Sequence, residues 1–300
     1  RGSLDLSWDL RNRTVPANFR LITFEEAQIS LQKGVYSHII CHTIKNLFWL
    51  LPYQRRDIVF AAHIPLFKNS TFLRSKSLIK KFTVLFWQKF FGLKMIAVSP
   101  FKQESWGIPC DVARFFPVPF PPELLAPAKS REVRGAYVGN NIIERGEELG
   151  WSVLKELIAH APIQVIGRNP GIPSAFIPAN FRDFVAEFSK AHFYVYTVSA
   201  EFGDGYNTAM LEAMLLGLPV VALPNPSSPI VHGENGLLAE DTEGIKNHIS
   251  SLLANETLRL TLGAAAKQTV LRDFSPEAFW AVWSRVLKLP PPSSSTQESL

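Results

Sequence analysis

The feature that most constrains the fold is the stretch from Gly203 to Leu238, GDGYNTAMLEAMLLGLPVVALPNPSSPIVHGENGLL. It predicts a glycine-rich turn, a short helix over 208–216 and a buried parallel strand over 218–222. A helix that follows a glycine turn points free backbone N–H groups at the turn, so its first turn can bind a phosphate. A plain, well-capped helix is the structural alternative, and both can hold together. The candidate phosphate-binding positions are Gly205, Tyr206, Asn207 and Thr208.

Glu212 adds a second kind of contact, one helical turn further along. A carboxylate can accept hydrogen bonds from two neighbouring hydroxyl groups at once, which suits the diol of a ribose. Glutamate is also a strong helix former found on many exposed helix faces, and that is the structural alternative. Diphosphate together with ribose makes a sugar nucleotide the expected ligand.

Strand-like runs alternate with helix-like runs along the chain, which predicts parallel, doubly wound sheets covered by helices. A proline-rich linker separates two such series, at Pro117, Pro119, Pro121, Pro122 and Pro127. Before the linker, strands are expected at 20–24, 37–41, 57–62, 95–98 and 113–118, with helices at 25–33, 44–51 and 102–106. After it, strands are expected at 135–139, 162–166 and 193–196, with helices at 147–160, 182–190, 242–255, 256–272 and 276–287.

The linker predicts two domains, over residues 1–125 and 126–274, followed by an aromatic helix within 275–289. The tail at 290–300 is rich in proline and serine and is expected to be disordered. Lys and Arg minus Asp and Glu gives 17 − 8 = +9 for 1–125 and 14 − 18 = −4 for 126–300. We therefore expect the first domain to meet an anionic partner.

Composition narrows the cellular setting and the cofactors. Cys41 and Cys110 are too few for a disulfide framework, so a reduced, cytoplasmic setting is expected. No stretch has the length and apolar character of a transmembrane helix. No Asp-x-Asp pair or Cys/His cluster has metal-site spacing, so no metal is expected.

The stretch 72–94 interleaves six basic residues with aromatic ones. A basic aromatic helix can lie on an anionic bilayer, which predicts peripheral attachment to the inner face of the membrane. Aromatic residues at helical spacing are more often core, and that is the alternative. Nucleic acid is not expected, because no binding motif accompanies the charge.

Three motifs point to a known family. Asp204-x7-Glu212 runs into Ala-Met-x-x-Gly-x-Pro-Val-Val, ending at Val221. His232–Leu238 reads HGENGLL, and Ala136–Gly139 reads AYVG, with Arg-Gly following at 145–146. Together they resemble the donor-site motifs of retaining, family 4 type glycosyltransferases with the GT-B fold. The resemblance covers 135–285 in element order, and 20–120 only loosely.

The resemblance implies two Rossmann-like domains facing across a cleft, the first one short, with the terminal helix crossing back to the first domain. It implies that Asp204 contacts hydroxyl groups of the donor sugar, with Glu201 as the rival acid. The alternative for Asp204 is a simple turn residue between two glycines. It further implies that Gly139 and Arg145 lie at the diphosphate, where a guanidinium fork suits phosphate oxygens.

Other candidates have weaker support. Arg145 has acidic neighbours and can equally be a surface residue, while Arg168 follows a strand at a ligand-binding sheet edge. His63 follows a strand and resembles the family's histidine near the sugar, although such a histidine is more often structural. Ser99 matches a cleft serine of the family or a helix cap, and His42 is a weaker candidate still.

These observations predict a metal-independent, retaining glycosyltransferase that uses a nucleoside-diphosphate sugar as co-substrate and needs no cofactor. Its acceptor is an unidentified glycan or lipid-linked molecule. The alternative is a degenerate GT-B protein that binds a nucleotide sugar or a partner without turnover, and another GT-B enzyme such as an epimerase is third. Two departures from the family motif favour the degenerate form: Asn140 stands in place of arginine, and Asp204 in place of glutamate. The glycine-rich loop that usually opens the first domain is also not found in 1–19.

Overall fold

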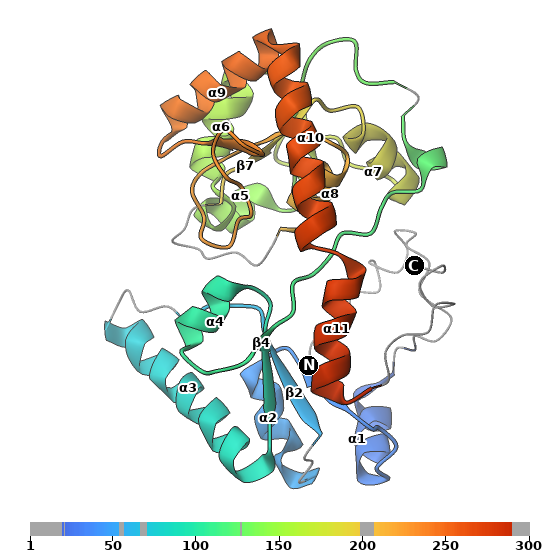
Figure 1. Ribbon diagram of the computed structural model, residues 1–300, viewed down its shortest axis with the longest axis vertical. Coiled ribbons are helices and arrows are strands. Elements are labelled where there is room, and N and C mark those ends of the chain that lie inside the picture. Colours follow the sequence, from blue (N-terminus) through green and yellow to red (C-terminus); the bar gives the residue numbers. More distant parts are fainter. Residues whose placement is uncertain are drawn as a thin grey trace. The chain divides into compact units, whose positions relative to one another are not determined.

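The computed structural model describes residues 20, 22–53, 57–66, 71–126, 128–198 and 207–289, without the side chains of 71–75. The chain divides into two compact α/β units (Figure 1). The central unit contains Phe116–Phe274, and the N-terminal unit joins Asn18–Phe115 to the segment that starts at Ser275.

A four-stranded parallel sheet forms the core of the N-terminal unit, in the order β1-β2-β3-β4. Its second strand is buried along its whole length, and Leu47, Phe60 and Trp87 pack in the cluster on one face of the sheet. The strands are β1 (Ile39–Cys41), β2 (Ile58–Ala62), β3 (Lys94–Ala97) and β4 (Asp111–Val112). The helices are α1 (Phe24–Gln32), α2 (Ile44–Leu50), α3 (Thr71–Phe91) and α4 (Pro100–Trp106), with a 3-10 turn at Leu51–Tyr53.

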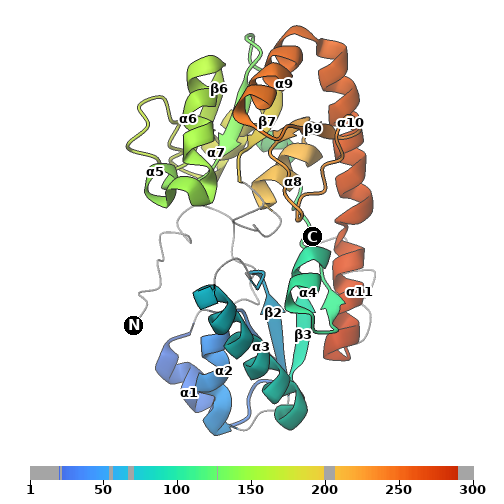
Figure 2. The ribbon, with the colours of Figure 1, turned by 90° about the vertical axis from the view of Figure 1, so that its left-hand side faces the viewer.

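The last described helix, α11 (Pro276–Leu287), belongs to the N-terminal unit although it follows the central unit in the chain (Figure 2). Trp283 packs in one cluster with Val59 and Ile96 of the sheet. Arg285 Nη2 lies 2.5 Å from Asp111 Oδ1, which ties the helix to the edge strand β4.

Two expected strands of the N-terminal unit are wrong. The described residues of 20–24 do not form a strand, because Thr23 caps α1: its Oγ1 accepts from the Glu26 N–H, and the Glu26 carboxylate accepts from the Thr23 N–H. This capping box outweighs the β-branched character of the segment. The strand expected at 113–118 lies at Asp111–Val112 instead. After Ala113 the prolines at 117 and 119 offer no N–H to a neighbouring strand.

A five-stranded parallel sheet forms the core of the central unit, in the order β6-β5-β7-β8-β9. The chain runs from β5 to β6 on one side, and then returns to β7 on the other side of β5. The strands are β5 (Gly135–Val138), β6 (Ile163–Ile166), β7 (Phe193–Tyr196), β8 (Val220–Ala222) and β9 (Gly236–Leu238). The helices are α5 (Ile142–Arg145), α6 (Trp151–His160), α7 (Phe181–Phe188), α8 (Thr208–Leu215), α9 (Thr242–Ala254) and α10 (Glu256–Asp273), with 3-10 turns at Pro122–Leu124 and Gly146–Leu149.

The reversal of strand order around β5 matters for function. In open α/β sheets, ligands bind outside the carboxyl ends of the strands where the order reverses. The turns after β5 and β6 meet at that edge, and α8 begins beside it.

The proline-rich segment packs with the central unit. The Phe120 ring meets those of Phe181, Phe184 and Phe188 edge-on, with centroids 6.0–6.2 Å apart. The two units therefore divide at 115/116, earlier than the expected boundary at residue 125, because this aromatic side chain anchors the linker to α7.

Candidate functional site

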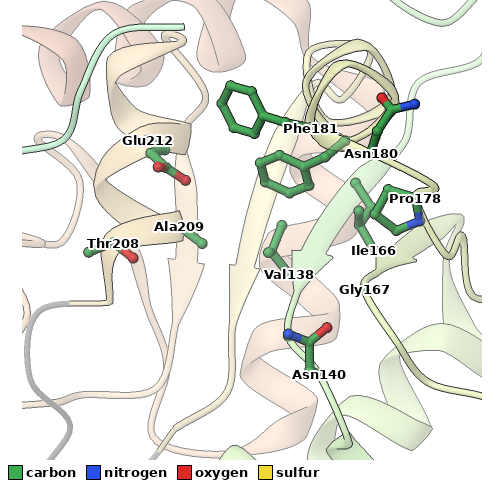
Figure 3. Close-up of a pocket in the computed structure, with 12 residues that line it drawn as sticks. Val138, Asn140, Ile166, Gly167, Pro178, Asn180, Phe181, Thr208, Ala209 and Glu212 are labelled. Atoms are coloured by element: carbon green, nitrogen blue, oxygen red, sulfur yellow. The ribbon is translucent and has the colours of Figure 1, made fainter. Parts of the chain in front are cut away.

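A cavity of about 300 Å³ opens at the switch point of the central sheet (Figure 3). Its lining comes from the ends of β5 and β6, from the segment leading into α7, and from the first turns of α8. The lining residues are Val138, Gly139, Asn140, Ile166, Gly167, Pro178, Asn180, Phe181, Phe184, Thr208, Ala209 and Glu212.

Helix α8 presents its N-terminal half to this cavity. Asn207 caps the helix, since its Oδ1 accepts from the Met210 N–H at 3.1 Å. Thr208 and Glu212 lie on the cavity side of the helix (Figure 3). Glu212 is only 6% exposed, and among the described lining residues it is the one ionisable side chain. The arrangement places a carboxylate one turn above helix N–H groups, as a diol and a phosphate would require.

Two close turns form the floor of the cavity. Asn140, after β5, accepts at Oδ1 from the Arg168 N–H at 2.7 Å, which links the turns that follow β5 and β6. Asn169 is buried and strengthens this link: its Nδ2 donates to Gly139 O at 2.8 Å, and its Oδ1 accepts from the Ile142 N–H at 2.9 Å. The turns approach so closely that a Cβ built on Gly167 lies 2.2 Å from Gly139 O.

The wall opposite Glu212 is apolar. Pro178 and Phe181 form it together with Phe184, and the rings of the two phenylalanines stack with centroids 6.1 Å apart (Figure 3). Asn180 fixes the start of α7 by accepting at Oδ1 from the Asp183 N–H at 3.0 Å. A flat apolar surface beside a carboxylate suits an aromatic base attached to a ribose.

The structure brings some predicted site residues together and leaves others apart. Gly139, Thr208 and Glu212 line one cavity, and Asn207 caps the helix beside it. Arg145 is exposed on α5, and its guanidinium lies 2.7 Å from Glu148 Oε1. This agrees with the alternative that Arg145 is a surface residue beside acidic neighbours. Arg168 is exposed as well, and neither arginine lines the cavity. The positions outside the described residues are Glu201, Asp204, Gly205 and Tyr206.

Sequence reasoning missed Asn169, Pro178 and Phe181. A cap signal was present at Asn180, just before the amphipathic helix α7, and it marked the correct element. It did not show that the helix N-terminus borders a cavity with α8, because that requires the tertiary arrangement of the sheet.

A histidine pair lies at the carboxyl edge of the N-terminal sheet. His42 follows β1 and His63 follows β2, and His42 Nδ1 lies 2.6 Å from His63 Nε2. The His63 ring also stacks on Phe115, with centroids 5.3 Å apart. Burial lowers the pKa of His63 to about 4, with smaller electrostatic contributions from the neighbouring His42 and from the fully buried Lys102. Predicted candidate Ser99 caps α4 by accepting from the Lys102 N–H.

Acid is expected to destabilise the N-terminal unit through His63. Its pKa falls from 6.5 to about 4 on folding, so the unfolded chain binds more protons between these values. Stability from this group is therefore complete above the unfolded pKa and is lost as the pH drops toward the folded pKa. Urea unfolding near pH 7 and near pH 5 measures the change. The free energy of unfolding should fall more between these pH values for wild type than for His63→Gln. Equal losses in both proteins would contradict the assignment.

Two negative findings apply to the described ranges alone. Within them, no group of three or more His, Cys, Asp or Glu side chains comes together in a way that suits a metal ion. None of the helices in this part of the chain is both long and apolar enough to cross a membrane.

Comparison with known sequences supports a family for the central unit. Residues 152–255, less than half of the chain, match the family model for group 1 glycosyl transferases. An uncharacterized glycosyltransferase of Methanocaldococcus jannaschii is 33% identical over 85 residues, or 27% of this chain and 22% of that protein. The capsular polysaccharide biosynthesis glycosyltransferase CapM of Staphylococcus aureus is 25% identical over 112 residues, which are 36% of this chain and 29% of CapM. The chain therefore aligns with less than a third of either curated relative.

Solved structures extend the similarity to most of the chain. Anabaena HepE, crystallised with UDP, is 16% identical with a TM-score of 0.64, over 91% of this chain and 82% of HepE. The fold is GT-B. TarM is also 16% identical, with a TM-score of 0.65, over 86% of this chain and 57% of TarM. At these identities the likeness shows the architecture, two parallel sheets with flanking helices, as the sequence predicted.

Proposed function

We propose that this GT-B protein is a glycosyltransferase that takes a sugar from a nucleoside-diphosphate donor held in the cavity beside α8. The observation that carries the proposal is the nearly buried Glu212 carboxylate facing that cavity above the N-terminus of α8. The group 1 glycosyl transferase match over 152–255 includes Glu212 and the other lining residues from Ile166 onward. HepE, which shares the fold, has been crystallised with UDP-glucose.

We assign each part of the donor to one part of the cavity lining. The ribose diol bonds to Glu212, the base lies on the wall of Pro178 and Phe181, and the diphosphate meets the first N–H groups of α8. Breaking the bond between sugar and phosphate leaves negative charge on the diphosphate. Helix N–H groups aimed at that position stabilise this charge as it develops, because they are already oriented when the bond breaks.

The finer parts of the proposal follow the family motif. The sugar is transferred with retention of configuration, and its hydroxyl groups contact Asp204 or Glu201, both outside the described residues. His63 is assigned the sugar contact that the resemblance implies. The acceptor is a glycan or a lipid-linked molecule. Retaining enzymes of this type are not assigned a protein nucleophile, and we nominate none.

A second function has one observation in its favour. The described lining of the cavity contains a negative side chain and no positive one, since Arg145 is paired with Glu148 and Arg168 is exposed. A site with few cations favours binding over turnover, because the leaving diphosphate receives less charge stabilisation. A nucleotide-sugar-binding module is therefore the alternative.

Measuring release of nucleoside diphosphate from a panel of UDP-, GDP- and ADP-sugars separates the two functions. A transferase releases the diphosphate from at least one donor, at a rate that falls in the Asp204→Ala or the Glu201→Ala variant. Binding of a donor without release, with acceptor mixtures present, would favour the binding module and overturn the proposed activity.

Turnover is expected to survive chelation by EDTA. Helix N–H groups are assigned the stabilisation of the leaving diphosphate, which a divalent cation supplies in metal-dependent enzymes. The rate of diphosphate release with and without EDTA measures this. Complete loss of turnover that is restored by magnesium or manganese would contradict the metal-independent mechanism.

A further inference from the structure

Helices α2 and α3, together with the 3-10 turn that follows α2, expose a continuous apolar surface on the N-terminal unit. We call it the α2–α3 face and define it by Phe48, Leu51, Ile79, Phe82 and Phe86. Ile79 is 65% exposed, Phe82 66% and Phe86 49%. These side chains, with Thr83 and Trp87, surround a groove of about 370 Å³. The two helices lie side by side at the surface of the unit in both views (Figures 1 and 2).

Helix α3 already packs into the core of the unit through other side chains, so its exposed apolar side chains are additional to its core contacts. Val84 and Trp87 of α3 are almost completely buried, and Trp87 packs against Phe91 with ring centroids 4.6 Å apart. An α-helix makes a turn in about 3.6 residues, so Phe82 and Phe86 lie on a face different from that of Val84. The helix thus has one apolar face in the core and a second one in solvent.

The charged residues of α2 and α3 are all basic. Neither α2 nor α3 contains an aspartate or a glutamate. Lys45, Lys76, Lys80 and Lys89 are exposed on the same two helices, and Lys89 Nζ lies 5.7 Å from the centre of the Phe90 ring. An apolar strip bordered by lysines matches the boundary of an anionic bilayer, where the rings enter the acyl region and the ammonium groups reach lipid phosphates.

We propose that the α2–α3 face docks on the surface of an anionic membrane, with α3 lying in the plane of the lipid headgroups. The lysines argue against a second copy of the chain as occupant, because two such faces would bring like charges together. The proposal does not depend on the donor site and is tested without nucleotide.

Vesicle sedimentation tests the docking. The full chain should pellet with vesicles of phosphatidylcholine and phosphatidylglycerol, and stay in the supernatant with phosphatidylcholine alone. Salt should release it, because screening weakens exposed charge interactions. Replacing Lys76, Lys80 and Lys89 with Gln should lower the vesicle affinity on the order of 100-fold, about fivefold for each lysine near the surface. Ile79→Ser with Phe82→Ser should lower it at least tenfold.

Matched controls come from the central unit. Leu260 and Leu271 of α10 are 66% and 51% exposed, and Lys155 and Lys267 are exposed as well. Changing these leucines to Ser, or these lysines to Gln, should leave vesicle binding unchanged. Circular dichroism checks that every variant is folded. We expect the variants to fold, because the substituted side chains are exposed.

Three outcomes would overturn the proposal. Wild-type protein that stays in the supernatant with anionic vesicles at low salt rules out docking. Binding that persists in both α2–α3 variants assigns it to another surface. A concentration-dependent dimer in light scattering that the Ile79→Ser, Phe82→Ser variant abolishes, without vesicle binding by wild type, makes the face a contact between copies.

Discussion

Replacing Glu212 with glutamine is expected to weaken the binding of a nucleoside diphosphate by roughly 5- to 150-fold, or about 1–3 kcal/mol. Glutamine keeps the size of the side chain, but it offers one neutral acceptor in place of the carboxylate that we propose bonds two ribose hydroxyls. Glu212 is nearly buried, so little water replaces the lost contact. Calorimetric titration with UDP, GDP and ADP measures the change in Kd.

Two controls isolate the ribose contact. Glu240→Gln removes a charge from an exposed position in the same unit and should leave the Kd unchanged. A nucleotide that lacks both ribose hydroxyls should bind the wild type and Glu212→Gln alike, because neither protein can make the bonds. If Glu212→Gln binds every nucleotide as tightly as wild type, the carboxylate does not hold the ribose.

Gly167→Ala is expected to lower the free energy of unfolding of the central unit by roughly 2–5 kcal/mol and to abolish nucleotide binding. Gly167 has a φ of +133°, which side chains rarely adopt, and its Cβ would lie 2.2 Å from Gly139 O. Relieving that overlap separates the two turns that form the floor of the cavity. Urea unfolding and titration with UDP measure the two effects.

The matched control is Gly233→Ala. Gly233 has a φ of +78°, but no atom lies within 4 Å of its added Cβ. Its free energy of unfolding should fall by only about 1–2 kcal/mol, because only the left-handed backbone conformation is unfavourable for alanine there. Gly167→Ala with stability and affinity equal to those of wild type would mean that the close approach of the turns is not required.

The architecture was predictable because each element has its own local signal. Short apolar runs between helix-like segments predicted the strands. The motif around Glu212 predicted both the helix and the strand that follows it. The error at 20–24 arose from a short run in which hydrophobicity and a cap signal disagree. Thr23 and Glu26 form the capping box that decides it.

The site was only partly predictable, because its walls come from segments that are distant in the sequence. Glu212 and Gly139 belong to motifs and were proposed from them. Phe181 and Asn169 belong to no motif, and only the sheet topology brings them to the cavity. The structure shows what Asn140 does in place of the family's arginine: its side chain accepts a hydrogen bond from the turn that follows β6. The charge that an arginine would bring to this turn is therefore absent from the described lining.

A crystal structure of the protein with a bound nucleoside diphosphate tests the central claim most directly. The account predicts the ribose hydroxyls within hydrogen-bonding distance of the Glu212 carboxylate, the base against Phe181, and the diphosphate at the N-terminus of α8. A nucleotide bound elsewhere in the central unit, or one with its ribose away from Glu212, would contradict it.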